Sequence, residues 1–584
     1  MRLGFVRATK RESLIYTCFP KLSCKMAEED ASGQFLCPPK DKEEYPPVYR
    51  QHSAYNPLYT FRLPSGKTRH YQQQYADIYF LRLARLKPAV AEIAAAEWEE
   101  FTIAGENARR VDRVLDVRQG ELCWVVGTVY MDLPLKPNIL DDISKEHWTA
   151  APPSRKTYLD PSNQGGTQTM LEDGSGRLRL TGTLLQSALL VTGAVVAVLG
   201  TENANGDFEV VDVKVPDLAP QPARWESQYA DSASGKRKRS PSETPVDGPR
   251  KKIALLSGLG ITGTSGDTVA LTLLTDYLLG YGEGYGNVGT GSSPIRSAQI
   301  SRLIIAGNSL GSSVPPSLEE QDEDAAVKKR RQAKKYGYDA SAYNASPITH
   351  LDNFLAEILP SIPVTIMPGE NDPANFALPQ QEIHRAMLPR SRNYCSAPRL
   401  GIDEPPSEPG WLDTVTNPWQ GDVEGWRLWG CSGQNVDDVL RYMSLDDDQT
   451  ENGQDIEGDT RLRLMEAMLR WRCAVPTAPD TIWCYPFQDK DPFVLQACPH
   501  VFFTGNQPAF RTTVIEKSVS ASSMDVEGDQ PSKVRLLALP KFRETGELVL
   551  LDAETLEVEV VKFGTWQSVK EVESLDAPVN DSQA

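Results

Sequence analysis

The sequence is poor in the residues that most often bind metals. Six of its 584 residues are histidine, and its nine cysteines are scattered without any C-x-x-C spacing. A zinc ribbon or an iron–sulfur cluster needs cysteines or histidines at short intervals, so neither is expected from this chain alone. An odd number of scattered cysteines is instead typical of reduced thiols in an intracellular protein.

Long apolar runs and excess positive charge are also missing. The longest apolar run, residues 188–199, is interrupted by Thr192 and Gly193 and is shorter than the roughly 18 residues that span a bilayer. We therefore expect no membrane partner. The 61 Lys and Arg stand against 79 Asp and Glu, which makes the formal net charge −18. Such a chain repels phosphate backbones except at a local basic patch, so strong DNA binding by the chain alone is disfavoured.

The chain is long and apolar enough for more than one folded domain. Its 584 residues are 40% hydrophobic, which supports two or three cores. Residues 26–50 are rich in Pro, Lys and Glu without periodicity, so we predict a disordered N-terminal segment over residues 1–50. The basic residues 1–25 resemble a mitochondrial leader, but Met26 opens an ordinary acidic start, and we favour a misassigned start or a disordered tail.

A helical segment is predicted over residues 51–105. Apolar residues between Tyr71 and Glu99 recur mostly every three or four positions, and Pro88 interrupts them. Because proline removes a backbone donor and breaks a helix interior, this pattern predicts a pair of helices.

Between residues 106 and 222 the chain changes to short runs of β-branched and aromatic residues separated by turn formers. The runs are 122–130, 168–171, 177–183, 194–200 and 208–215. They predict a five-stranded OB-fold β-barrel, a fold that binds nucleic acid or protein. Acidic residues surround Trp124 and Tyr130, so we favour protein. The alternative is a single-stranded DNA-binding barrel formed by residues 113–218.

Residues 223–252 are predicted to be a basic linker rich in Ser and Pro. Two basic clusters about ten residues apart resemble a bipartite nuclear import signal, and the alternative is a solvated charge run. The candidate import residues are Lys236, Arg237, Lys238, Arg239, Arg250, Lys251 and Lys252. Ser240-Pro241 beside the first cluster could accept a phosphate.

From residue 253 to 566 one pattern repeats five times: a short apolar strand, then an abrupt loop of small residues. The strands are 253–257, 302–306, 364–367, 426–429 and 501–504. Strands that end in such loops predict an α/β sandwich with a site at one sheet edge. We predict a disordered tail over residues 567–584.

The first of these loops also spells a nucleotide-binding motif. Residues 258–263 read G-x-G-x-x-G, and a helical segment is predicted after them over residues 268–279. The next strand, however, ends in Gly307-Asn308, where a dinucleotide site needs an acid. A dinucleotide site is therefore disfavoured.

The residues that close the five strands resemble the motifs of the calcineurin-like metallophosphoesterases with the metal ligands replaced. That family carries D-x-H, G-D-x-x-D, G-N-H-D/E, a histidine loop and G-H-x-H in this order. Here the matching stretches read Ser257-Gly-Leu, Gly307-Asn-Ser-Leu-Gly, Gly369-Glu-Asn-Asp, Gly430-Cys-Ser-Gly and Gly505-Asn-Gln-Pro. The vestigial positions are Ser257, Leu259, Asn308, Gly311, Glu370, Asn371, Asp372, Asn506 and Pro508.

A two-metal phosphoesterase site needs several carboxylates and neutral imidazoles around two cations roughly 4 Å apart. Glu370 and Asp372 are the only acids at matched positions, and no histidine lies at one. The resemblance therefore implies an inactive phosphoesterase-like domain without catalytic residues, bound metal or cofactor. The enzymatic alternative is a residual phosphodiesterase that holds one ion weakly through Glu370, Asp372, Asn308 and Asn506.

An OB-fold in front of an inactivated phosphoesterase domain resembles the B subunits of eukaryotic replicative DNA polymerases, over about residues 55–563. Within that family the similarity is greatest to the delta type, as found in fungi. The sequence Leu135-Lys-Pro-Asn-Ile-Leu140 favours delta over the alpha and epsilon types. The other stretches that carry the resemblance are residues 74–83, 127–134, 257–260, 306–308 and 368–373.

This resemblance implies a non-catalytic accessory subunit of a nuclear complex for DNA replication and repair. Such a scaffold bridges the cysteine-rich C-terminal module of the DNA polymerase delta catalytic subunit to a third accessory subunit, and meets DNA only through the complex. A large rigid core suits that task, and missing metal ligands do not impair it.

Overall fold

The computed structural model describes residues 50–64, 76–103, 105–137, 157–160, 166–225, 250–263, 268–281, 297–311, 345–396, 409–443, 456–517 and 532–564. The predicted disordered segments 1–49 and 567–584 lie outside these ranges. The described residues belong to one compact unit that begins at Arg50. None of the described helices is both long and apolar enough to cross a membrane.

The predicted five-stranded barrel is present, and its topology is that of an OB-fold. Its strands close in the order β5–β6–β7–β9–β8–β5, and β7–β9 is the parallel pair. Alternating residues of β5 point to opposite sides, so that Cys123 and Val125 fill the barrel while Trp124 and Val126 pack outside it. The strands are β5 (Leu122–Asp132), β6 (Gln168–Glu172), β7 (Arg177–Thr181), β8 (Val195–Glu202) and β9 (Asp207–Lys214).

One continuous helix covers the outside of the barrel, so the prediction of two helices is wrong. Helix α1 (Ala76–Trp98) runs through Pro88 without a break. A proline inside a helix costs about 3 kcal/mol. Leu86, Val90 and Ala94, on both sides of the proline, pack against β5 and β8 in one cluster, and this burial offsets the cost.

The second half of the chain forms two packed six-stranded sheets, as predicted for an α/β sandwich. The first has the order β13–β12–β11–β10–β19–β20, and the second has the order β1–β14–β15–β16–β18–β17. The first contains β13 (Leu412–Thr414), β12 (Val364–Met367), β11 (Ile300–Ala306), β10 (Lys252–Leu256), β19 (Glu547–Asp552) and β20 (Val558–Lys562). The second contains β1 (Tyr55–Leu58), β14 (Trp419–Val423), β15 (Trp426–Cys431), β16 (Val501–Gln507), β18 (Lys533–Pro540) and β17 (Arg511–Glu516).

Strand β1 comes from the segment predicted to be helical. It pairs antiparallel with β14, and Tyr55 lies opposite Val423. The Tyr55 hydroxyl donates to the buried carboxylate of Asp413, and the Arg302 guanidinium lies 3.8 Å from the centre of the Tyr55 ring. Residues 55–58 therefore belong to the sandwich, although about 200 residues separate them from the rest of it.

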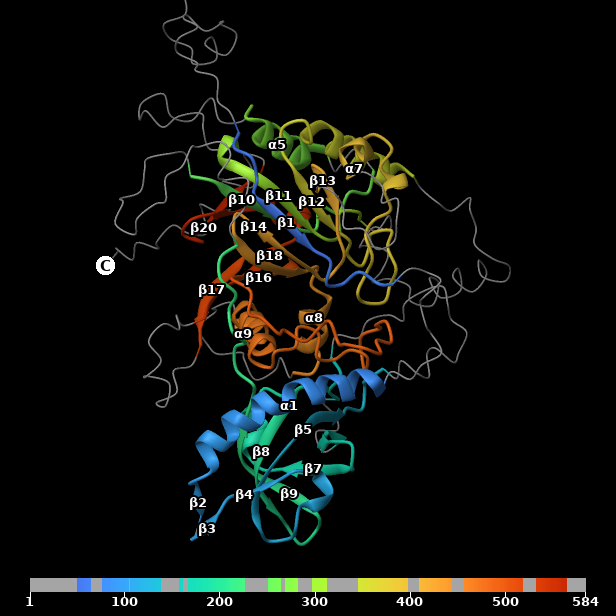
Figure 1. Cartoon of the computed structure of the whole chain (residues 1–584). Helices are drawn as coiled ribbons and strands as arrows, with labels where there is room; N and C mark the ends of the chain where they lie inside the picture. The colour runs from blue at the N-terminus through green and yellow to red at the C-terminus, as the bar shows by residue number, and fades with distance from the viewer. Residues whose placement is uncertain are drawn as a thin grey trace, which may run out of the picture. The chain divides into compact units, whose positions relative to one another are not determined.

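Helices cover both outer faces of the two sheets (Figure 1). In β10, Ile253 and Leu255 face the second sheet, while Ala254 and Leu256 face helices α5 (Thr268–Leu279) and α7 (Ser346–Ile358). Helices α8 (Gln434–Leu440) and α9 (Ile456–Arg470) pack on the opposite face of the second sheet. The sandwich is thus four layers deep.

Short elements complete the chain. They are β2 (Thr102–Ile103), β3 (Glu106–Asn107), β4 (Arg109–Val111), α3 (Leu184–Ser187), α10 (Phe542–Thr545) and the 3₁₀ turns η3 (Val114–Asp116), η6 (Ser297–Gln299), η9 (Arg385–Met387) and η10 (Ser391–Tyr394).

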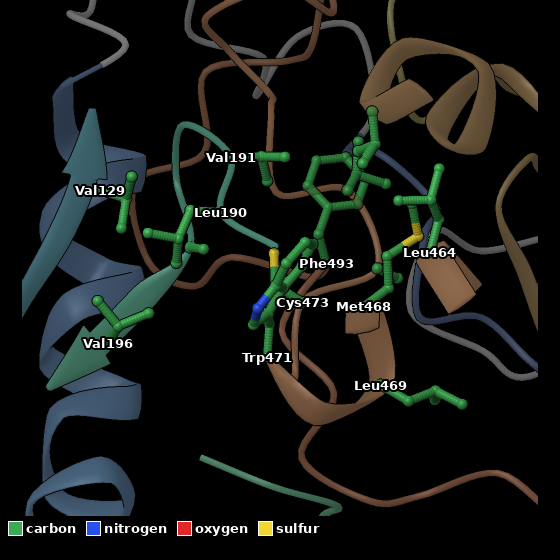
Figure 2. Close-up of a cluster of buried hydrophobic side chains, with 14 of the residues drawn as sticks. Val129, Leu190, Val191, Val196, Leu464, Met468, Leu469, Trp471, Cys473 and Phe493 are labelled. Atoms are coloured by element: carbon green, nitrogen blue, oxygen red, sulfur yellow. The ribbon is translucent and has the colours of Figure 1, made fainter. Parts of the chain in front are cut away.

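The barrel and the sandwich share one hydrophobic core. Figure 2 shows barrel residues such as Val129 and Val191 in the same cluster as Leu464, Met468 and Phe493 of the sandwich. These side chains are fully buried. Because a continuous core leaves no solvated layer between its parts, the two domains form a single packed body rather than two separate bodies joined by a linker.

Candidate functional site at the strand-end loops

The five predicted loops meet at the carboxyl ends of the central strands. The Gly258 N–H donates to the Gly307 carbonyl (3.0 Å), and the Gly260 N–H donates to the Asn308 carbonyl (3.1 Å), which joins the loops after β10 and β11. The Asn371 N–H donates to Asn308 Oδ1 (3.1 Å), which adds the loop after β12. The loops after β10, β11 and β12 therefore meet at one edge of the first sheet, while β15 and β16 belong to the second sheet.

Asp372 is buried among these loops, with 6% of its surface exposed. Its Oδ2 accepts the N–H of Gly369 (2.8 Å) and of Ser309 (3.2 Å). Its Oδ1 accepts the N–H of Leu310 (2.9 Å). Burial raises the pKa of Asp372 to about 6, and the backbone N–H donors oppose that rise. Both carboxylate oxygens therefore hold the β11 and β12 loops together.

Asn308 comes just after β11, and Asn506 lies at an irregularity near the end of β16. Each follows a glycine, and both adopt left-handed backbone, with φ of 51° and 58°. Asparagine tolerates this conformation better than most residues do. The Asn506 N–H donates to Ser257 Oγ (3.0 Å), and Asn506 Nδ2 donates to the Ser432 carbonyl (2.7 Å). Asn506 thus connects the end of β16 to the loops after β10 and β15.

The loops approach so closely that glycine is required at two of the strand ends. A Cβ atom on Gly369 would lie 2.3 Å from the backbone nitrogen of Asn308. On Gly505 it would lie 2.4 Å from the Ala306 carbonyl oxygen. Any larger residue would force the loops apart, so the glycines are explained by close packing rather than by an opening for a ligand.

The other vestigial positions divide between core and surface. Ser257 is buried and its hydroxyl contacts the carbonyls of Leu539 and Pro540, while Leu259 packs in the apolar cluster under helix α5. Four positions do not join that core: Gly311 is partly exposed, and Glu370, Asn371 and Pro508 are exposed.

No group of three or more His, Cys, Asp or Glu side chains is placed to hold a metal ion within the described ranges. The six cysteines in those ranges are free thiols. His350 lies in helix α7, and His384 accepts the Ala386 N–H at the start of η9. His500 precedes β16 and accepts the Arg427 N–H (3.0 Å); burial lowers the pKa of His500 to about 4, so it is neutral near pH 7.

The barrel surface is the alternative site, for single-stranded DNA. Six arginines on or beside its strands each lie within 4 Å of a carboxylate. They are Arg109, Arg110, Arg113, Arg118, Arg177 and Arg179. Because their charges are already balanced locally, they do not make the uncompensated basic groove that such binding requires.

The import candidates fall in two places. Residues 236–239 lie outside the described residues. Lys252 is the first residue of β10 and pairs with Glu559 (2.5 Å), and Lys251 pairs with the largely buried Glu424 (3.0 Å). The end of the predicted linker is therefore part of the sandwich, and its two lysines are already engaged by carboxylates.

Arg82 is a residue whose role the sequence did not reveal. It is completely buried between the barrel helix and the sandwich, where its Nε lies 2.8 Å from Asp491. The sequence did contain a pattern that could have indicated this burial. Ile78, Arg82 and Leu86 share one face of α1 at four-residue spacing. A charged residue inside an apolar stripe predicts a buried partner, although the stripe alone does not say which.

Comparisons with known proteins match both halves of this architecture. The family described as "DNA polymerase delta subunit OB-fold domain" matches residues 74–213, and the family of the B subunits of DNA polymerases alpha and epsilon matches residues 253–512. The barrel and most of the sandwich therefore each match a family of DNA polymerase accessory subunits.

Whole-chain relatives specify the type. The "DNA polymerase delta small subunit" of Saccharomyces cerevisiae is 34% identical over 526 residues, which cover 88% of this chain and 93% of the relative. That of Arabidopsis thaliana is 34% identical over 517 residues, covering 88% and 97%. The "DNA polymerase delta subunit 2" of Drosophila melanogaster is 31% identical over 508 residues, covering 86% and 95%. The chain belongs to the family of DNA polymerase delta small subunits.

Proposed function

We propose that this chain is a non-catalytic scaffold of the DNA polymerase delta complex. It bridges the cysteine-rich C-terminal module of the catalytic subunit to a further accessory subunit, and it meets DNA only through the complex. Its sandwich is a calcineurin-like phosphoesterase fold that has lost its metal ligands. The membership of the polymerase delta family supports this role.

One observation carries the non-catalytic part of the proposal. The Asp372 carboxylate, the buried acid at the vestigial site, accepts three backbone N–H groups with its two oxygens. A carboxylate has about four lone-pair sites with which it could meet a cation, and backbone N–H groups already fill three of those of Asp372, so little capacity is left for a metal. Glu370, the other acid at a matched position, is exposed to solvent instead of buried beside Asp372. The residual phosphodiesterase is therefore the weaker hypothesis.

The scaffold role is tested by affinity purification of the tagged full-length chain from cells. We expect one large polymerase chain and at least one smaller subunit to be recovered at near-stoichiometric yield, because a large rigid surface supports stable complexes. The tag expressed alone is the control. Recovery of the chain without any polymerase subunit would contradict the proposal.

The proposed location is the nucleus, where polymerase delta acts. Since Lys251 and Lys252 are engaged in the sandwich, residues 236–239 are the stronger import candidate. Fusing residues 226–249 to a fluorescent reporter tests this directly, and we expect nuclear accumulation that is lost when Lys236, Arg237, Lys238 and Arg239 are changed to Ala. A reporter that stays evenly distributed before the change would mean that entry depends on a partner.

A further inference from the structure

Residues 135–137, the described part of the stretch from which the delta type was predicted, follow barrel strand β5 and lie against the sandwich. Lys136 Nζ lies 2.6 Å from Asp480 Oδ2, a residue of the sandwich more than 340 positions away. The same ammonium group donates to the Met131 carbonyl (2.9 Å) and lies 4.2 Å from the centre of the Tyr130 ring. Lys136 thus touches both domains.

This ion pair is enclosed. The side chains of Lys136 and Asp480 are only 9% and 16% exposed. The Tyr442 hydroxyl also donates to Asp480 Oδ2 (3.3 Å). Burial raises the pKa of Asp480, and the charge of Lys136 opposes that rise. Removing the lysine would leave a carboxylate with little water and one hydroxyl partner, which is costly.

Backbone hydrogen bonds beside the pair make the same connection. The Leu135 N–H donates to the Tyr158 carbonyl (3.1 Å), and the Tyr158 N–H donates to the Arg441 carbonyl of the sandwich (2.9 Å). The Tyr158 hydroxyl donates to the buried carboxylate of Asp438 (2.6 Å). The connection between β5 and β6 therefore bonds to the sandwich at two points, Lys136 and Tyr158.

We infer that Lys136 is an internal latch: it fixes the β5–β6 connection of the barrel against Asp480 of the sandwich. Residues 135–137 then serve docking between the two domains of this chain, and they are not a contact for another subunit. The stretch from which the delta type was predicted thereby gains a role in packing the two domains of this chain together.

Hydrogen–deuterium exchange on the full chain tests the latch. The amides of Leu135 and Tyr158 report local opening, because Leu135 donates to Tyr158 within the connection and Tyr158 donates to Arg441 of the sandwich. We expect Lys136→Met and Asp480→Asn each to speed this exchange roughly tenfold. The double variant K136M/D480N should speed it by much less than the roughly hundredfold product, because the two side chains interact directly.

Lys533→Met is the matched control. Lys533 pairs with Glu516 in the open, with side chains 64% and 59% exposed, so its loss should change exchange less than roughly twofold. The latch is overturned if K136M leaves exchange at Leu135 and Tyr158 unchanged, or if the effects of the two single changes multiply.

A pull-down separates this inference from the proposed function. Only the pull-down rests on the proposed function; the exchange measurement does not. Folded K136M should recover the catalytic chain as well as wild type does. Loss of that chain with unchanged exchange would make the stretch a partner contact and overturn the latch. Failure of wild type to recover any polymerase subunit would instead overturn the proposed function, while the exchange result would still decide the latch.

Discussion

Replacing Arg82 by Met is expected to lower the free energy of unfolding by about 3–5 kcal/mol, because it leaves the Asp491 carboxylate buried without its counter-charge. Both side chains are essentially inaccessible, at 0% and 1% exposed. Arg82 Nη1 also donates to the Pro476 carbonyl (2.6 Å), and its Nη2 donates to the Ala478 carbonyl (3.0 Å). The change would therefore also remove the donor from the carbonyls of Pro476 and Ala478. Urea unfolding measures the loss.

Two further variants identify the cause of that loss. Arg85→Met removes a neighbouring arginine whose contact with Gln496 is exposed, and it should cost less than about 1 kcal/mol. The double variant R82M/D491L replaces the ion pair by apolar groups, and it should recover much of the stability lost in R82M. Equal midpoints for R82M and R85M would show that the buried pair does not hold the domains together.

The second large effect is expected at Asp372. Changing Asp372 to Ala should cost about 3 kcal/mol or more, because three N–H groups of the β11 and β12 loops lose their acceptor in a buried place. Asp372→Asn should cost less, about 1–2 kcal/mol, since one amide oxygen can still accept two of those bonds. Urea unfolding with and without EDTA provides the measurement.

Metal dependence distinguishes this role from the enzymatic alternative. If Asp372 only holds the loops, EDTA and added Mn²⁺ leave the stability of wild type and both variants unchanged. Manganese-dependent phosphodiesterase turnover that disappears in Glu370→Gln, an exposed position whose change should not affect folding, would instead revive the residual enzyme.

Local patterns predicted much of the fold correctly. The five barrel strands and the five strand–loop units were recoverable because burial imposes a regular spacing on apolar residues, and tight loops demand glycine. Helix α5 was predicted with its observed bounds. The same local rule failed at Pro88, where it predicted a helix break. The packing of α1 on the barrel outweighs the missing hydrogen bond, and such packing is invisible in a window of the sequence.

The candidate site was predictable only in part. The predicted resemblance placed Asp372 and Glu370 at positions matched to metal ligands, and it left open a weak ion site there. It could not show that both oxygens of Asp372 accept N–H groups of residues 309, 310 and 369. Hydrogen-bond partners that are some 60 residues apart depend on how two strands are placed, and no local pattern encodes that.

What the sequence determined by itself is the class of the protein: a barrel, a sandwich, and short apolar strands followed by small residues. These features depend on residue types at short spacing. Only the tertiary structure decided what the exceptional residues do. Arg82 meets Asp491 across 409 positions, and residues 55–58 complete a sheet whose other strands begin at Trp419. Such pairings arise because a buried charge or a strand edge must find a partner somewhere in the fold, and the folded chain alone specifies where.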